Sequence, residues 1–363
     1  MNAIDDTLAG RPLPLPVDYQ RFLSLGSRRA PQTLYVHERG YRSSTINTDT
    51  LGLRYSHLAG KRFSVGERGG APRVNLLVGG STALGIGASS DEHTVASYLS
   101  MLTGEVWLNL GGCGLNAAQE LLMFLSHQHR LGQVGHVVVL SGLNTLAHEA
   151  LGEILADGQP MASAKPYQDY LNRFTEGLQA CGQPPHASLW QRLGRALAPR
   201  RLEPCPSTIT LSSPEKRLAQ AADMIGRTLR HWERFLADSH TTLTFILQPL
   251  LPWCREQVPA GELSMLSALE QQPSHFDALL AGVFDSQLHA TFFRRIKHQA
   301  DTVPCYDMNG MLSSSPVFGE NLFVDRLHFN DLGNNALAKV ITAKLGLAQE
   351  KYASRKVTPI KLV

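Results

Sequence analysis

The run VNLLVG at residues 74–79 constrains the fold most, because all but one of its residues before the glycine are strongly apolar. A strand with this pattern is buried on both faces, which is typical of a parallel sheet covered by helices on both sides. The run ends at Gly79 and Gly80, and Ser81 follows. A plain turn would explain this ending, but a hydroxyl at the tip of a buried strand also suits a reactive group.

Strand and helix patterns alternate along the rest of the chain. Further strands are predicted at 105–111, 136–142, 242–249 and 303–308. Helices are predicted at 89–104, 116–132, 213–239, 287–299 and 331–346. This alternation predicts an α/β protein, a flavodoxin-like three-layer α/β/α sandwich with a central, mostly parallel sheet. Reactive groups in such folds gather beyond the carboxyl ends of the strands.

The domain organisation follows from where this pattern begins and is interrupted. We expect residues 1–45 to form an N-terminal arm, 46–346 one domain, and 347–363 a basic tail. Within the domain, 151–212 is proline-rich and too long for an ordinary connection, so we expect an insertion there that forms a partly helical lid.

Composition narrows the classes of function and the cellular location. The net charge is only +3 and the positive residues are scattered, which argues against a nucleic-acid surface. The five cysteines are odd in number and contain no CxxC pair, which favours a reducing compartment. No stretch approaches the ~18 to 20 apolar residues of a membrane span. We therefore expect a cytoplasmic protein with no membrane span; the sequence does not indicate its oligomeric state.

Four polar residues follow predicted strands or precede the last predicted helix: Ser81, Asn144, Asp325 and His328. A nucleophilic serine needs a base, and histidine is the usual one. A carboxylate on the far ring nitrogen fixes the tautomer of that base. Asp325 and His328 are three residues apart and can approach each other, whereas only the fold can bring Ser81 to them.

Acyl transfer also needs hydrogen-bond donors for the oxyanion of the tetrahedral intermediate. The amide of Gly114, the side-chain amide of Asn144 and the amide of Ser81 are the three candidates. Each residue has a simpler explanation in a turn, a loop or a surface, and a DxxH spacing arises by chance. Their order, each at a different strand end or before the last helix, favours a common site.

Two other groups of residues offer competing chemistry. His127 and His129 are two residues apart on a predicted helix and point about 200° apart, so they cannot chelate one ion from it. We interpret them as surface residues. Cys113 lies near a candidate glycine, but no base is placed beside it in the sequence, so we do not expect a cysteine nucleophile.

Four segments together resemble the SGNH (GDSL-like) hydrolase family, named for its Ser, Gly, Asn and His blocks. VGGST is similar to the block around the nucleophile, and NLGGCG to the glycine block, with Gly114 as the best match and Gly111 or Gly112 as alternatives. SGLNT resembles the asparagine block, and DRLHFNDLG the DxxH block. Upstream, INTDTLGLR resembles an NxxG(F/L)R segment of bacterial members, and FILQP fits a strand common in the same group.

The resemblance implies a triad of Ser81, His328 and Asp325, with an oxyanion hole from Ser81, Gly114 and Asn144, and no metal or organic cofactor. It implies a small-molecule ester or thioester substrate, with esterase, lipase, thioesterase, deacetylase and acyltransferase chemistry all open. Gly80 and Thr145 differ from the residues usual in these blocks, but neither of them is the nucleophile or the base. The alternative, from another functional class, is a protein that keeps the fold and binds an acylated partner without catalysis.

Overall fold

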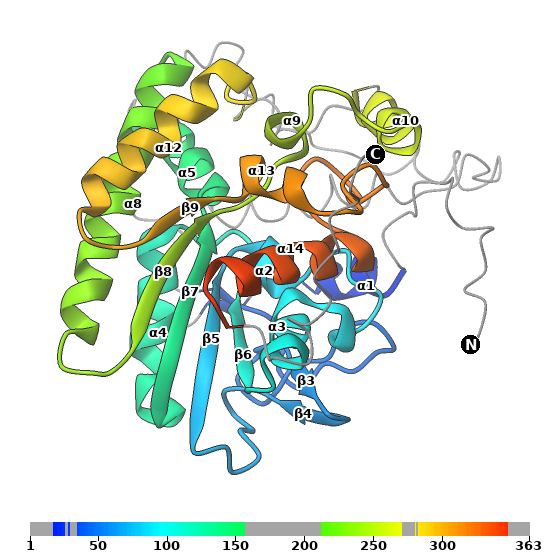
Figure 1. Ribbon diagram of the computed structural model, residues 1–363, viewed down its shortest axis with the longest axis vertical. Coiled ribbons are helices and arrows are strands. Elements are labelled where there is room, and N and C mark those ends of the chain that lie inside the picture. Colours follow the sequence, from blue (N-terminus) through cyan, green and yellow to red (C-terminus); the bar gives the residue numbers. More distant parts are fainter. Residues whose placement is uncertain are drawn as a thin grey trace, which may run out of the picture.

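A five-stranded parallel sheet forms the centre of the molecule, seen in the computed structural model of Figure 1. The structure describes residues 17–25, 28–29, 35–156, 212–270, 280 and 282–347. The strand order is β6-β5-β7-β8-β9, and every neighbouring pair is parallel. The strands are β5 (Arg73–Gly79), β6 (Trp107–Gly111), β7 (Gln133–Ser141), β8 (Thr242–Leu247) and β9 (Cys305–Asp307).

The sheet is buried on both faces, as the apolar runs predict. Side chains of a strand point alternately to its two faces. In β7, Val137 and Val139 belong to one hydrophobic core, while Val138 and Leu140 belong to the other. Continuous apolar runs are therefore required because both faces are covered.

Helices form the two outer layers, which confirms the predicted three-layer α/β/α sandwich (Figure 1). One core includes residues of α4 (Ala117–Leu131), α5 (Leu143–Ala156), α8 (Pro214–Leu236) and α12 (Ser286–Ala300). The opposite core includes residues of α3 (Val95–Thr103) and α14 (Asp331–Lys344). Each of these helices was predicted from the sequence except α5, whose span overlaps the expected insertion.

The predicted helix at 89–104 is divided into a 3₁₀ turn, Asp91–His93, and α3. Ser90 caps the 3₁₀ turn, and the hydroxyl of Thr94 accepts a hydrogen bond from the amide of Ser97 to cap α3. Gly104, in the left-handed conformation, ends the helix as expected.

Shorter elements surround the sheet. They are α1 (Val17–Ser24), β1 (Arg28–Arg29), β2 (Tyr35–Val36), β3 (Ser56–Leu58), β4 (Lys61–Phe63), α2 (Ser81–Leu84), α9 (Leu251–Cys254), α10 (Ala260–Glu270), α13 (Met308–Met311) and a 3₁₀ turn, Leu312–Ser314. The sequence did not predict α1, which is only eight residues long, yet its Tyr19 and Phe22 are buried in the core. This part of the N-terminal segment therefore contributes to the main core.

The expected insertion at 151–212 begins inside a helix, because α5 extends to Ala156. Residues 157–211 and the tail from 348 onward lie outside the described residues, so the lid stays a prediction. Within the described ranges, no helix is both long and apolar enough to cross a membrane.

The strand order places one strand end at a favourable position for a site. The chain leaves β5 for its neighbour β6, and then crosses to β7 on the other side of β5. Ligands bind outside the carboxyl end of the strand at which the order reverses in this way. The end of β5 is Gly79, which is paired with Gly111 of β6 and Leu140 of β7.

A buried carboxyl group contacts Ser141, the last residue of β7. Glu120 in the first turn of α4 is 1% exposed, and one of its oxygens accepts a hydrogen bond of 2.6 Å from the hydroxyl of Ser141. Its other oxygen has no hydrogen-bond partner. Burial raises the pKa of Glu120 from 4.5 to about 8, so the side chain is largely protonated at neutral pH.

We predict that Glu120→Gln flattens the pH dependence of stability. Between pH 4.5 and about 8 the folded protein retains a proton that the unfolded chain has released, so its stability decreases as pH rises. The decrease from this group is at most about 1.4 kcal/mol per pH unit. Urea unfolding at pH 5 and pH 8 should show a smaller loss in Glu120→Gln than in wild type. The exposed Glu256→Gln serves as control, and an unchanged slope in Glu120→Gln would contradict the assignment.

Candidate active site

Ser81 lies directly beyond the carboxyl end of β5. It is the first residue of α2 and is 7% exposed. Gly79 before it has φ +155°, and a Cβ there would lie 2.0 Å from the carbonyl oxygen of Leu140 in β7. Only glycine fits at this point, so the chain can turn sharply from strand to helix and place the hydroxyl at the sheet edge.

His328 and Asp325 are brought to Ser81 by the loop before α14. Nε2 of His328 lies 2.7 Å from Oγ of Ser81, and Nδ1 lies 2.6 Å from Oδ2 of Asp325. A carboxylate oxygen accepts, so Nδ1 of the neutral ring carries the proton. Nε2 is thereby left as the acceptor for the serine hydroxyl. The structure thus joins the three predicted residues in one hydrogen-bonded chain.

The loop fixes the orientation of the carboxylate. Oδ1 of Asp325 accepts hydrogen bonds from the amides of Leu327 at 2.7 Å and His328 at 2.8 Å. Burial by itself would raise the pKa of Asp325, but the neighbouring His328 and these hydrogen bonds keep it below its usual value. Asp325 is therefore a carboxylate over the whole neutral range.

Asn144 reaches the same place from the start of α5. Its Nδ2 would lie 2.5 Å from a Cβ built on Gly80, next to the serine. A side chain at position 80 would therefore require the Asn144 amide to move. Thr145, the residue after Asn144, is fully buried, and its hydroxyl accepts a hydrogen bond of 3.1 Å from the amide of Ala117 at the start of α4.

The glycine block lies beyond the end of β6. The amide of Gly111 donates to the side chain of Asn109 at 2.8 Å, and the amide of Gly112 donates to the carbonyl of Gly79 at 3.0 Å. These two amides, the alternatives to that of Gly114, are therefore engaged within the protein. Gly114 has φ +73° and lies in the turn between β6 and α4.

Neighbouring reactive side chains do not compete with Ser81. Burial raises the pKa of the Cys113 thiol to about 12, so it is not a thiolate at neutral pH. On α4, His129 is exposed as expected, whereas His127 is partly buried, so the interpretation of both as surface residues is wrong for His127. Among the described residues, no group of three or more histidine, cysteine, aspartate or glutamate side chains is arranged to bind a metal ion.

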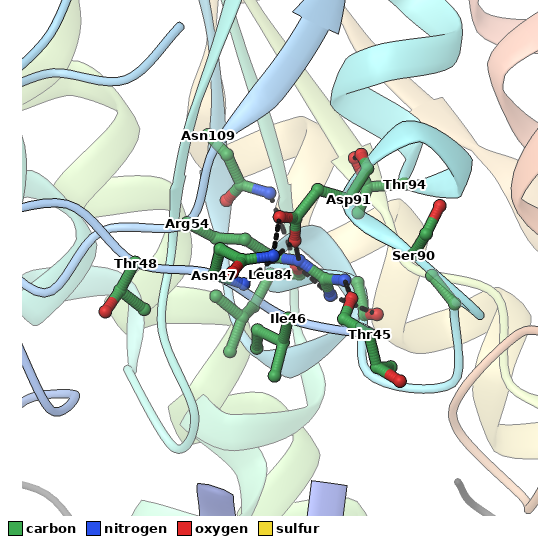
Figure 2. A network of polar contacts seen from close by, with 12 residues as sticks. Thr45, Ile46, Asn47, Thr48, Arg54, Leu84, Ser90, Asp91, Thr94 and Asn109 are labelled. Atoms are coloured by element: carbon green, nitrogen blue, oxygen red, sulfur yellow. Dashed lines mark hydrogen bonds and ion pairs between the residues drawn. The ribbon is translucent and has the colours of Figure 1, made fainter. Parts of the chain in front are cut away.

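Arg54, from the INTDTLGLR segment, supports the short helix that begins at Ser81 (Figure 2). Its Nη1 donates to the carbonyls of Leu84 at 3.2 Å and Gly85 at 2.8 Å, at the carboxyl end of α2. The carbonyls of a last helical turn have no partner inside the helix. Arg54 therefore satisfies them with a charged donor and fixes the end of the helix opposite the serine.

The guanidinium itself is fully buried and paired. Its Nε donates to Oδ1 of Asp91 at 2.7 Å, and its Nη2 to the carbonyl of Thr45 at 2.7 Å. The hydroxyl of Tyr19 in α1 accepts from Nη1 at 2.9 Å. Asn47 also donates to Asp91, at 2.8 Å from its side chain, as Figure 2 shows. Removing one partner of such a buried ion pair leaves the other charge buried and uncompensated, which strongly destabilises the protein.

A second bridge connects the serine helix to the histidine loop, and the sequence did not reveal it. Nε2 of Gln248, just beyond β8, donates to Oγ1 of Thr82 at 3.3 Å, and that hydroxyl donates to the carbonyl of Leu327 at 3.2 Å. The FILQP segment was the only signal, because it places a polar residue at the end of an apolar strand.

Comparison with known proteins gives matches in structure only. No protein-family model matches the chain, and no curated protein matches it. Among solved structures, it is similar to a lipolytic G-D-S-L family member from Veillonella parvula, at 12% identity and TM-score 0.36, covering 75% of this chain and 97% of that one. It is also similar to a lipase/acylhydrolase from Enterococcus faecalis, at 15% identity and TM-score 0.32, covering 76% and 97%.

A lipase from a goat rumen metagenome is a third match, at 12% identity and TM-score 0.40, covering 75% of this chain and 96% of that one. At such identities and TM-scores, function has to be inferred from the site itself.

We predict that replacing Arg54 destabilises the protein far more than replacing a surface arginine. Arg54→Met leaves Asp91 buried without its cation, which costs about 3 to 5 kcal/mol for pairs of this kind. Arg62→Met removes a half-exposed partner of Glu67 and should cost less than about 1 kcal/mol. Urea unfolding measures both, and equal costs would contradict the role of Arg54.

Proposed function

We propose that this protein is a serine hydrolase of the SGNH type that cleaves a small ester or thioester through an acyl-enzyme. The observation that carries the proposal is the hydrogen-bonded chain from Ser81 through His328 to Asp325, with 2.7 Å and 2.6 Å between the successive polar atoms. Such a chain has a nucleophile, a base of fixed tautomer and a carboxylate that stabilises the protonated ring.

In the first half-reaction, Oγ of Ser81 attacks the carbonyl carbon while Nε2 of His328 takes the hydroxyl proton. The amides of Ser81 and Gly114 and the side chain of Asn144 donate to the resulting oxyanion. The intermediate then collapses: the bond to the leaving alcohol or thiol breaks, and His328 returns the proton to that group. The acyl chain is now esterified to Ser81.

In the second half-reaction, water attacks the acyl-enzyme and His328 accepts a proton from it. As the second intermediate collapses, the bond between the acyl carbon and Oγ of Ser81 breaks, His328 returns the proton to Oγ, and the acid is released. If another hydroxyl replaces water, the same site transfers the acyl group to that acceptor. Acyl transfer is thus the related alternative, and product analysis with a competing alcohol distinguishes it from hydrolysis.

A cytoplasmic location is part of this proposal. Its support is the set of three free cysteines among the described residues, Cys113, Cys254 and Cys305, which suits a reducing compartment.

We predict that Ser81→Ala abolishes hydrolysis of short p-nitrophenyl acyl esters. Loss of a triad member lowers kcat by about 10⁴- to 10⁶-fold in enzymes of this kind. Ser313→Ala, which removes an exposed hydroxyl, should leave the rate unchanged. Equal rates in wild type and Ser81→Ala would remove the serine from the mechanism. A folded wild type without activity would favour the non-catalytic binding protein.

Asn144→Ala should act on the transition state and leave substrate binding nearly intact. Removing one oxyanion donor lowers kcat by about 10²- to 10³-fold. We therefore expect that decrease in kcat with a KM close to wild type, measured with the same esters. Thermal unfolding of the variant controls for misfolding. If a folded Asn144→Ala keeps the wild-type kcat, the amide does not contact the oxyanion.

A further inference from the structure

Two buried or partly buried histidines flank the proposed oxyanion glycine, and the triad uses neither. His37, just after β2, accepts a hydrogen bond of 3.1 Å at Nε2 from the amide of Cys113, the residue before Gly114. His148, in α5, has its Nε2 3.1 Å from the carbonyl oxygen of Gly114. The loop is therefore anchored immediately before and immediately after the peptide unit that carries the Gly114 amide.

The partners of His148 define its tautomer. A carbonyl oxygen only accepts, so Nε2 must carry the proton that it donates to Gly114. Nδ1 lies 3.2 Å from Nδ2 of Asn116, and an amide nitrogen only donates, so Nδ1 must accept. The Asn116 amide cannot reverse without loss, because its Oδ1 caps α4 by accepting from the amide of Gln119 at 3.0 Å.

Both rings are neutral at neutral pH. Burial lowers the pKa of His148 to about 4 and that of His37 to about 4. A neutral ring with one donor and one acceptor matches both neighbours of His148, whereas a doubly protonated ring would face the Asn116 amide with a second donor. His148 is thus suited to hydrogen bonding, because the one N–H of its neutral ring donates to the carbonyl of Gly114.

The position of His148 on α5 links it to the other oxyanion donor. Asn144 and His148 are four residues apart, so they project from the same face of the helix. Asn144 is directed to Gly80 beside the serine, and His148 to the carbonyl of Gly114. One rigid helix therefore presents a side-chain donor and also fixes the loop that presents a backbone donor.

We propose that His148 is a positioning residue, whose ring N–H holds the Gly114 carbonyl so that the Gly114 amide is directed at the oxyanion. The inference rests on the proposed function and deepens it. A peptide unit is planar, so its N–H direction is set by the torsions at either side. With the preceding amide bound to His37 and the following carbonyl bound to His148, few torsional changes are left that would turn the Gly114 amide away.

The test compares His148→Leu with His148→Gln. Leucine removes the donor at similar volume, whereas Nε2 of glutamine can donate to the same carbonyl. Complete removal of an oxyanion donor costs about 10²- to 10³-fold in kcat, and misdirecting one should cost less, about 10- to 100-fold. We expect this decrease in His148→Leu with little change in KM, and substantial recovery in His148→Gln.

A second readout separates positioning from a general loss of structure. A boronic acid that forms a tetrahedral adduct with Ser81 should bind His148→Leu more weakly, by the same factor as kcat/KM falls. His127→Leu, which removes a partly buried histidine from α4 outside this loop, should leave both values unchanged. Far-UV circular dichroism establishes that the variants are folded.

Each outcome decides the inference. A wild-type kcat in His148→Leu overturns it, and so does an equal loss in folded His148→Gln and His148→Leu. A wild-type protein that hydrolyses no ester and binds no boronic acid overturns the proposed function, and the inference with it. Active wild type with an unaffected His148→Leu leaves the proposed function standing and removes only the role of His148.

Discussion

The contact between Nε2 of His328 and Oγ of Ser81 is the interaction on which the rest of the site depends, and it joins residues 247 positions apart. It forms because parallel strands bring their carboxyl ends to one edge of the sheet. Ser81 follows β5, and Gly114 and Asn144 follow the two strands on either side of it. The loop before α14 then supplies the base and the carboxylate from the far end of the chain.

The supporting groups show how a glycine-rich edge is made rigid. Glycines permit the sharp turns but bring no side chains of their own, so the backbone groups there need partners from elsewhere. A charged donor, Arg54, binds the carbonyls at the end of the serine helix. Neutral rings bind the loop around Gly114. In each case a tertiary partner satisfies a group that local structure leaves open.

Much of the fold was predictable from the sequence because the sheet is covered on both sides. The apolar runs of β5, β6, β7 and β8 favoured buried strands, and the alternation of predicted strands with helical segments left little choice of architecture. The candidate triad was predictable as a set of residues, because a serine, a histidine and a carboxylate at strand ends have a joint chemical purpose. Capping was less predictable, since Ser90 and Thr94 both suit the start of a helix and the chain uses both.

The remaining features depend on contacts between distant segments, which periodicity does not encode. Helix α1 is too short to give a clear pattern, and its burial depends on the core it meets. Nothing in the local sequence distinguishes His37 and His148 from His129, which is exposed on α4. The sequence also does not show that the Gly111 amide binds the Asn109 side chain and that the Gly112 amide binds the carbonyl of Gly79 in β5.

The most direct measurement of the central claim is labelling of the folded protein with a fluorophosphonate, followed by mass spectrometric mapping of the modified residue. The account predicts a single adduct on Ser81, lost when the protein is unfolded before labelling and formed far more slowly in His328→Ala. An adduct on a different residue, or equal labelling rates in wild type and His328→Ala, would contradict it.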